Sequence, residues 1–187
     1  VSLMLVGFSM MFMRSGARVT LLPLYAEQKL GFGAGDIGVL LSVSALTNLL
    51  IVNPAGRFVD SVGRKPVALV GLTTAALATA AYGIFDSFVG LLVVSMVFGV
   101  TAGLASIAPP AMVGDLAPEG VEGSAVGVYR MAGDLGFVFG PLVLGAVADT
   151  GAFTAGFFIA AGIMLIAAFL LSFVPETRRN PVVDSVS

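Results

Sequence analysis

The sequence predicts an all-α integral membrane protein in which six apolar helices cross the bilayer. Hydrophobic residues make up 58% of its 187 residues and charged residues only 11%, whereas a soluble domain carries about 25% charged residues. The charges are also clustered, so that four stretches contain no Asp, Glu, Lys or Arg: residues 37–56, 66–85, 87–114 and 150–175. Each is long enough to span, since about 20 helical residues cross about 30 Å of hydrocarbon.

Two further apolar stretches, residues 3–26 and 123–148, complete the six spans and carry charges inside them. The first has no basic region ahead of it and no small-residue cleavage site after it, so we interpret it as a mature helix rather than a signal peptide. We predict one transmembrane domain over residues 1–175 and a polar tail over residues 176–187. Its predicted spans are residues 3–26, 37–56, 66–85, 87–112, 123–148 and 150–175.

Basic residues predict the orientation, because Lys and Arg are retained on the cytoplasmic side when helices insert. One side of the predicted bundle holds Arg57, Arg64, Lys65, Arg178 and Arg179. The other side holds only Lys29. We therefore expect a multi-pass protein of the cell membrane with both termini in the cytoplasm.

The absence of Cys and His excludes several kinds of chemistry. Disulfides, the common zinc sites and nucleophiles that need a thiol or an imidazole all require these residues. A membrane-embedded enzyme would need clustered acids for a metal or a His or Ser dyad, and the sequence has neither pattern. We predict no catalytic residue, no metal, no cofactor and no nucleic-acid partner.

A weak internal repeat appears when the chain is shifted by 89 residues. Gly38, Gly56 and Asp60 then align with Gly127, Gly145 and Asp149. One interpretation is a duplication that relates three helices to the next three in opposite membrane orientation, as in secondary transporters. The alternative is coincidence in a chain that contains 24 glycines.

The connection between the second and third predicted spans combines charges with glycines at fixed positions. It reads Gly56-Arg57-Phe58-Val59-Asp60-Ser61-Val62-Gly63-Arg64-Lys65-Pro66. The glycines permit a tight turn, and the proline suits the first turn of a helix. Asp60 can reach a helix N-terminus, and Arg64 can reach a carboxylate. Retention of positive charge explains the cations, but not an acid and two glycines in register with them.

This connection resembles the cytoplasmic signature of the major facilitator superfamily. Leu21-Leu22-Pro23-Leu24-Tyr25-Ala26 in the first span and the Gly-Pro pattern of the fifth are also similar to members. The resemblance implies a 3+3 inverted repeat of helices and a gating role in which Asp60 meets a helix end of an opposite half. It also implies that Arg64 meets Asp115 at the end of the fourth span, in contacts that stabilise the outward-open state. The gating loop so defined comprises Gly56, Arg57, Asp60, Gly63, Arg64 and Lys65, with Asp115 as its partner.

The fifth span resembles the antiporter signature of the same family, except that Leu144 stands where a glycine is expected. Proline removes a helix hydrogen bond and glycines remove side chains, so this helix is expected to bend and to pack closely. A bent, tightly packed helix and an antiport-specific role both remain open. The helix-bend motif comprises Gly127, Gly136, Gly140, Pro141 and Gly145.

Charges inside spans are expensive and usually face a cavity or a partner. Arg14 and Arg18 stand one helical turn apart in the first span, which predicts a shared face. Arg130 and Asp134 have the same spacing in the fifth span; they either pair with each other or take part in transport, with Asp134 exchanging a proton or pairing with Arg14. The predicted substrate and cavity residues are Arg14, Arg18, Asn48, Arg130 and Asp134.

A member of this family is built from two six-helix halves around one midplane site. The resemblance therefore implies a partner half in the same chain or in a second copy. We expect this chain to be the C-terminal half, since it starts inside a span, lacks an Arg in the fourth span and continues from Glu176 into a polar tail. The predicted function is secondary active transport of a small solute across the membrane by alternating access, proton-coupled and directed to drug or metabolite efflux. The alternative is a non-transporting receptor or assembly scaffold of the same fold.

Overall fold

The computed structural model describes residues 1–177, without the side chains of Asn53, Arg57, Phe58 and Asp60. This part of the chain is helical, with short turns and no strand. The polar tail with Arg178 and Arg179 lies outside the described residues. The elements are α1 (Ser2–Phe12), η1 (Met13–Leu21), α2 (Leu22–Gln28), α3 (Ala34–Val62), α4 (Arg64–Tyr82), α5 (Phe88–Leu116), α6 (Glu122–Asp149) and α7 (Phe153–Leu171).

Four of these helices are long and apolar enough to cross a membrane: α3 over Ala34–Val52, α5, α6 and α7. The first predicted span differs from them, because α1, the π-helical segment η1 and α2 follow one another without a non-helical residue between them. None of these three segments alone reaches the length of a span. The fifth helix of the sequence prediction, α6, keeps Pro141 inside it and continues to Asp149.

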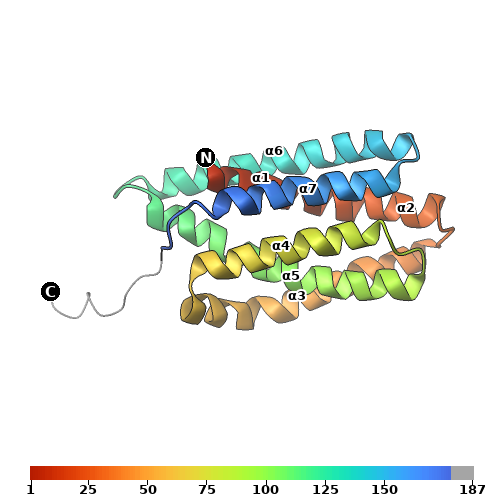
Figure 1. The fold of residues 1–187 in the computed structure, drawn as a ribbon, viewed down its shortest axis with the longest axis horizontal. Helices are drawn as coiled ribbons and strands as arrows, with labels where there is room; N and C mark the ends of the chain where they lie inside the picture. The colour runs from red at the N-terminus through yellow and green to blue at the C-terminus, as the bar shows by residue number, and fades with distance from the viewer. Residues whose placement is uncertain (178–187) are drawn as a thin grey trace.

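The helices lie side by side along the long axis of the molecule (Figure 1). We call the end with the N-terminus and the α3–α4 turn the Gly63 end, and the end with the α4–α5 turn the Asp86 end. Helix α5 packs against both α3 and α4, while α6 and α7 pack against α1 and η1. Contacts between α4 and α7 join the two groups.

Glycines bring three pairs of helices into backbone contact, one of them α4 and α5 at Gly71. A Cβ atom on Gly140 of α6 would lie 2.6 Å from the carbonyl oxygen of Phe12, and one on Gly136 would overlap the carbonyl of Phe8. In the same way, a Cβ atom on Gly99 of α5 would overlap the carbonyl of Ser44 in α3. Small residues permit such approaches where lipid offers no hydrophobic drive for helix association. These contacts fix α6 against α1 and α5 against α3.

The predicted loop between the second and third spans is mostly helix. Helix α3 continues to Val62 and α4 starts at Arg64, so Gly63 alone connects them. The expected connection is therefore helical over residues 57–62, because neither a proline nor a positive-φ residue lies between Pro54 and Gly63. The chain turns at Gly63, whose φ of 113° is accessible to glycine and strained for other residues.

Tyr25 anchors the Asp86 end. Its ring is fully buried and packs against Phe153 and Phe157 of α7, with ring centroids 5.7 Å away in each case. Its hydroxyl donates to the carboxylate of Asp86 in the α4–α5 turn. One side chain thus joins α2, the α4–α5 turn and the start of α7.

We predict that Gly136→Ala lowers the stability of the bundle by about 1–3 kcal/mol, because the new methyl group has only the backbone of α1 to displace. The expected fall in Tm is about 2–10 °C, measured by thermal aggregation of the detergent-solubilised protein. Gly127→Ala is the matched control in the same helix, since a Cβ atom there meets nothing within 4 Å. Equal Tm values for the two variants would contradict the prediction.

Candidate functional site

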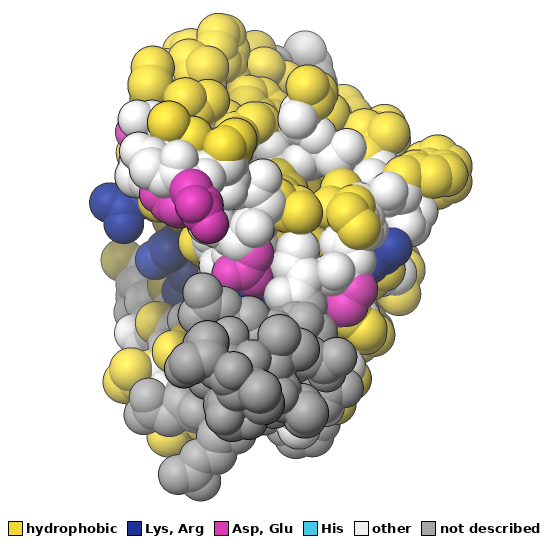
Figure 2. Space-filling view, turned by 90° about the vertical axis from the view of Figure 1, so that its left-hand side faces the viewer, with side chains coloured by type: hydrophobic (Ala, Val, Ile, Leu, Met, Phe, Trp, Pro, Cys, Tyr) yellow, Lys and Arg dark blue, Asp and Glu magenta, His cyan; other side chains and the backbone are white. Residues whose placement is uncertain are grey.

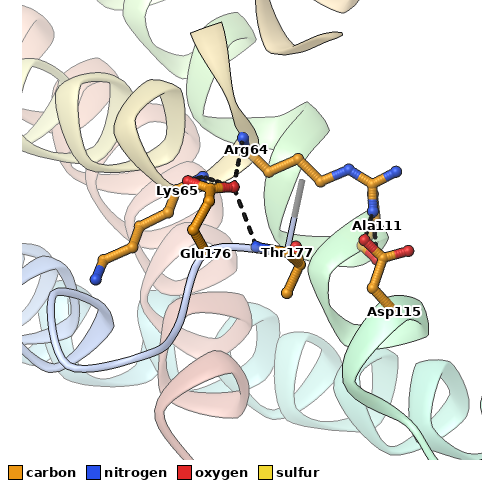
Figure 3. Close-up of polar contacts among 6 residues, drawn as sticks. All are labelled: Arg64, Lys65, Ala111, Asp115, Glu176 and Thr177. Atoms are coloured by element: carbon orange, nitrogen blue, oxygen red, sulfur yellow. Dashed lines mark hydrogen bonds and ion pairs between the residues drawn. The ribbon is translucent and has the colours of Figure 1, made fainter. Parts of the chain in front are cut away.

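Arg64 joins the start of α4 to the last turns of α5 (Figure 3). Its guanidinium group forms an ion pair with the carboxylate of Asp115 and donates a hydrogen bond of 3.2 Å to the carbonyl oxygen of Ala111. Each partner of the ion pair exposes 24% of its side chain. This is the one ion pair among the side chains that the structure describes, and it connects the two residues that the family resemblance paired.

A second acid holds the same turn from the other side. The carboxylate of Glu176, beyond the end of α7, accepts hydrogen bonds from the backbone N–H groups of Arg64 (3.0 Å) and Lys65 (3.1 Å) (Figure 3). A helix N-terminus leaves unpaired N–H groups and a partial positive charge, which a carboxylate stabilises. Gly63 occupies the N-cap position of α4 and has no side chain to accept these bonds, so the helix needs an acceptor from elsewhere.

Sequence reasoning missed Glu176, which was placed in the polar tail. The signal that points to it is the missing cap: α4 starts directly after a glycine, and an acid follows the last apolar helix on the same side of the bundle. Figure 2 looks onto this end and shows acidic and basic side chains gathered there between hydrophobic ones. Among the other gating-loop residues, Gly56 faces open space, because a Cβ atom added to it would have no atom of the described structure within 4 Å. The side chains of Arg57 and Asp60 lie outside the described structure.

A hollow of about 330 Å³ lies between α1, α5 and α6, in the half of the bundle nearer the Gly63 end. We call it the mid-bundle hollow because it lies between three helices of the bundle. Its walls combine apolar and polar side chains from all three helices. Arg130 and Asp134 both line it and are exposed, and no ion pair joins them. The lining residues are Gly7, Met10, Met11, Ser106, Pro110, Val126, Tyr129, Arg130, Gly133 and Asp134.

The two cations of the first span have different surroundings. Arg14 is exposed and makes no hydrogen bond or ion pair within the described residues. Arg18 is partly buried: its Nη2 donates to the carbonyl oxygen of Leu41 at 2.8 Å, and its guanidinium carbon lies 6.0 Å from the centre of the Phe98 ring. Both residues lie in the π-helical segment η1.

Three of the remaining predicted residues contact neighbouring helices in this structure. The side-chain amide of Asn48 donates to the carbonyl oxygen of Gly99 at 3.2 Å, which ties α3 to α5. Within the helix-bend motif, Gly136 and Gly140 contact α1, whereas built Cβ atoms on Gly127 and Gly145 meet nothing within 4 Å. Among the described residues, no group of three Cys, His, Asp or Glu side chains is placed to hold a metal ion.

A match to a known protein family identifies the family to which this helical chain belongs. The sequence model of the Major Facilitator Superfamily matches residues 3–186. The chain belongs to the major facilitator superfamily. It is therefore a membrane protein with the helical fold of a transporter family, which confirms the resemblance stated from the sequence.

Several proteins and structures of this family are similar to the chain. It is 25% identical over 165 residues to the quinolone resistance protein NorA of Staphylococcus aureus, covering 88% of the chain and 42% of NorA. It is 28% identical over 145 residues to multidrug resistance protein 1 of Bacillus subtilis, covering 78% and 37%. A crystal structure of a POT family transporter in complex with a thioalcohol conjugated peptide superposes with a TM-score of 0.82 at 22% identity, over 94% of this chain and 38% of that one. The chain thus spans about two fifths of the length of these relatives.

We predict that Glu176→Gln weakens the start of α4, because a neutral amide interacts less strongly with the helix N-terminus than a carboxylate does. The expected loss is about 0.3–1 kcal/mol, detected as severalfold faster hydrogen exchange of the amides of Arg64 and Lys65. Glu119→Gln serves as the control, since Glu119 is an exposed acid at the same end with no hydrogen bond to α4. Unchanged exchange in Glu176→Gln would show that the contact does not stabilise the helix.

Proposed function

We propose that the chain is one six-helix half of a secondary active transporter that moves a small solute across the cell membrane by alternating access. The observation that carries the proposal is the mid-bundle hollow, which brings Arg130 and Asp134 to a site that three helices of a major facilitator chain line. Charged side chains at membrane depth that lack a partner are typical of substrate and ion pathways. The lipid bilayer and a second six-helix half complete the working protein.

The packing of the helices supports an inverted repeat of three plus three. With a shift of 89 residues, Thr47 and Ile51 of α3 correspond to Gly136 and Gly140 of α6. In α3 these positions lie against the glycines of α5, and in α6 they lie against α1. The same shift relates the first helix to α5. The α3–α5 contact and the α6–α1 contact therefore involve corresponding helices at corresponding positions along them. In this proposal α4 and the α1–η1–α2 segment are the two further spans.

The Gly63 end is the cytoplasmic end in this proposal, with both termini on that side, because it holds the basic residues. The chain serves as the C-terminal half, since α5 contains no Arg. The other half comes from the same full-length chain or from a second copy. We propose that Arg64–Asp115 and Glu176 hold the cytoplasmic end closed and release when it opens.

Efflux of drug-like or metabolite solutes is the direction of transport that the relatives support, because two of them are named for quinolone and multidrug resistance. We assign proton coupling to Asp134, the acid that faces the mid-bundle hollow. A carboxylate in this position binds a proton in one state of the cycle and releases it in the other.

Counterflow in proteoliposomes that contain the full natural protein tests this function. We predict saturable counterflow with at least one amphipathic solute of a broad panel. In Asp134→Asn, counterflow should persist while transport driven by a pH gradient falls at least tenfold, because exchange needs no net proton movement. Lys29→Ala, at the Asp86 end, is expected to keep both activities. Absence of flux with every solute would favour the receptor or scaffold function instead.

The gating contacts have a separate test. We predict that Arg64→Ala speeds labelling of a single cysteine at Ser106, in the hollow, by a membrane-impermeant maleimide applied from the Gly63 side. Loss of about 1 kcal/mol of ion-pair energy shifts the balance between closed and open states about fivefold. The double variant Arg64→Asp with Asp115→Arg should restore slow labelling, because it reverses the pair. Equal labelling rates in all three proteins would refute the gating role.

A further inference from the structure

The mid-bundle hollow presents one cation and one anion on consecutive turns of a single helix. Arg130 and Asp134 are four residues apart in α6, which places their Cβ atoms about 6 Å apart on one face. Both side chains are exposed to the hollow and neither is paired with the other. Each therefore keeps its full hydrogen-bonding capacity for a third group that enters between them.

The surfaces around this pair are apolar and adaptable. Met10 and Met11 of α1 and Pro110 of α5 form walls of the hollow, and methionine side chains adjust to ligands of varied shape. The Tyr129 hydroxyl makes no hydrogen bond to the described residues and is the remaining donor near the charges. A hollow of about 330 Å³ fits the lower range of small-molecule sites.

Arg130 is the one cation and Asp134 the one acid among the described residues that line the hollow. A guanidinium group presents a planar fork of N–H donors, whereas an ammonium group on a solute is a compact point charge. Arg130 therefore favours an anionic group on a solute more strongly than Asp134 favours a cationic one. The planar guanidinium of Arg130 also matches a carboxylate with two parallel hydrogen bonds.

We propose that the mid-bundle hollow selects a zwitterionic amphiphile, a small solute whose carboxylate-like and ammonium-like groups are separated by an apolar body. Arg130 binds the anionic group, Asp134 binds the cationic group, and the methionines contact the apolar body. This inference rests on the proposed transport function and names its substrate class. Affinity falls in the order zwitterion, anion, neutral solute, cation.

The test uses four forms of one molecule: 4-(aminomethyl)benzoate, its N-acetyl derivative, its methyl ester and the doubly blocked neutral form. Binding of each to the purified full natural protein in nanodiscs is measured at equilibrium. Arg130→Gln should weaken binding of the zwitterion and of the N-acetyl anion about 10–100-fold, the range for a hydrogen bond to a charged group. Binding of the methyl ester should stay within about twofold, which also shows that the variant is folded.

Asp134→Asn should give the reverse pattern, with weaker binding of the zwitterion and the ester and little change for the N-acetyl anion. Arg130→Lys keeps the charge and should restore part of the lost affinity. Lys29→Gln and Glu27→Gln remove a cation and an acid exposed at the Asp86 end, and both should bind all four forms as the parent protein does.

Two results would overturn the inference: tightest binding of the methyl ester, or an equal loss for all four forms in Arg130→Gln. Because the readout is binding, its failure is distinct from failure of transport. Binding selective for the zwitterion without counterflow of that solute would support the site and count against the proposed function. Counterflow of solutes with no preference for their charge would support the proposed transport function and count against the zwitterion site.

Discussion

Backbone contact at glycines is the constraint from which the rest of the structure follows. Lipid tails are as apolar as the helix surfaces, so no hydrophobic effect drives helices together in a bilayer. Helices associate there through close van der Waals packing and through polar contacts between them. Gly136 and Gly140 let α6 lie directly against α1, and Gly99 lets α5 lie against α3. The contacts of Gly136 and Gly140 set the distance between α1 and α6, two of the three helices that line the hollow. A bulkier residue at the contact would move Arg130 and Asp134 relative to the opposite wall.

The two ends of the bundle are held by different kinds of interaction. At the Gly63 end, two acids bind the same turn. Asp115, near the end of α5, pairs with the side chain of Arg64, and Glu176, beyond the end of α7, accepts from its backbone N–H group. Ion pairs of this kind exchange readily with water and contribute little net energy, so breaking them costs little. At the Asp86 end, a fully buried Tyr25 packs between rings of α7, and separating it would expose apolar surface. Movement at the first end is therefore less costly than movement at the second.

The family resemblance and the spacing of charged residues each named residues that the structure brings together. The Arg64–Asp115 pair joins two residues that the family resemblance had matched, and the hollow contains the charged pair that sequence reasoning singled out in the fifth span. Spacing did not identify Glu176, because its partner is a helix N-terminus 112 residues earlier, and contacts with backbone groups leave no pattern of side chains. Nor did spacing identify the partner of Arg18, the carbonyl oxygen of Leu41 in α3.

The sequence by itself determined the all-helical membrane class and the family, because apolar length and a local signature are properties of contiguous residues. It also located most helix ends to within a few residues, although α3 extends six residues beyond its predicted end at 56. Tertiary structure decided which charges are paired and which are free. Arg18 is engaged by a carbonyl of α3, whereas Arg14, Arg130 and Asp134 have no partner among the described residues. The physical reason is that pairing depends on which helix faces lie opposite one another, and the glycine contacts between distant segments set those faces.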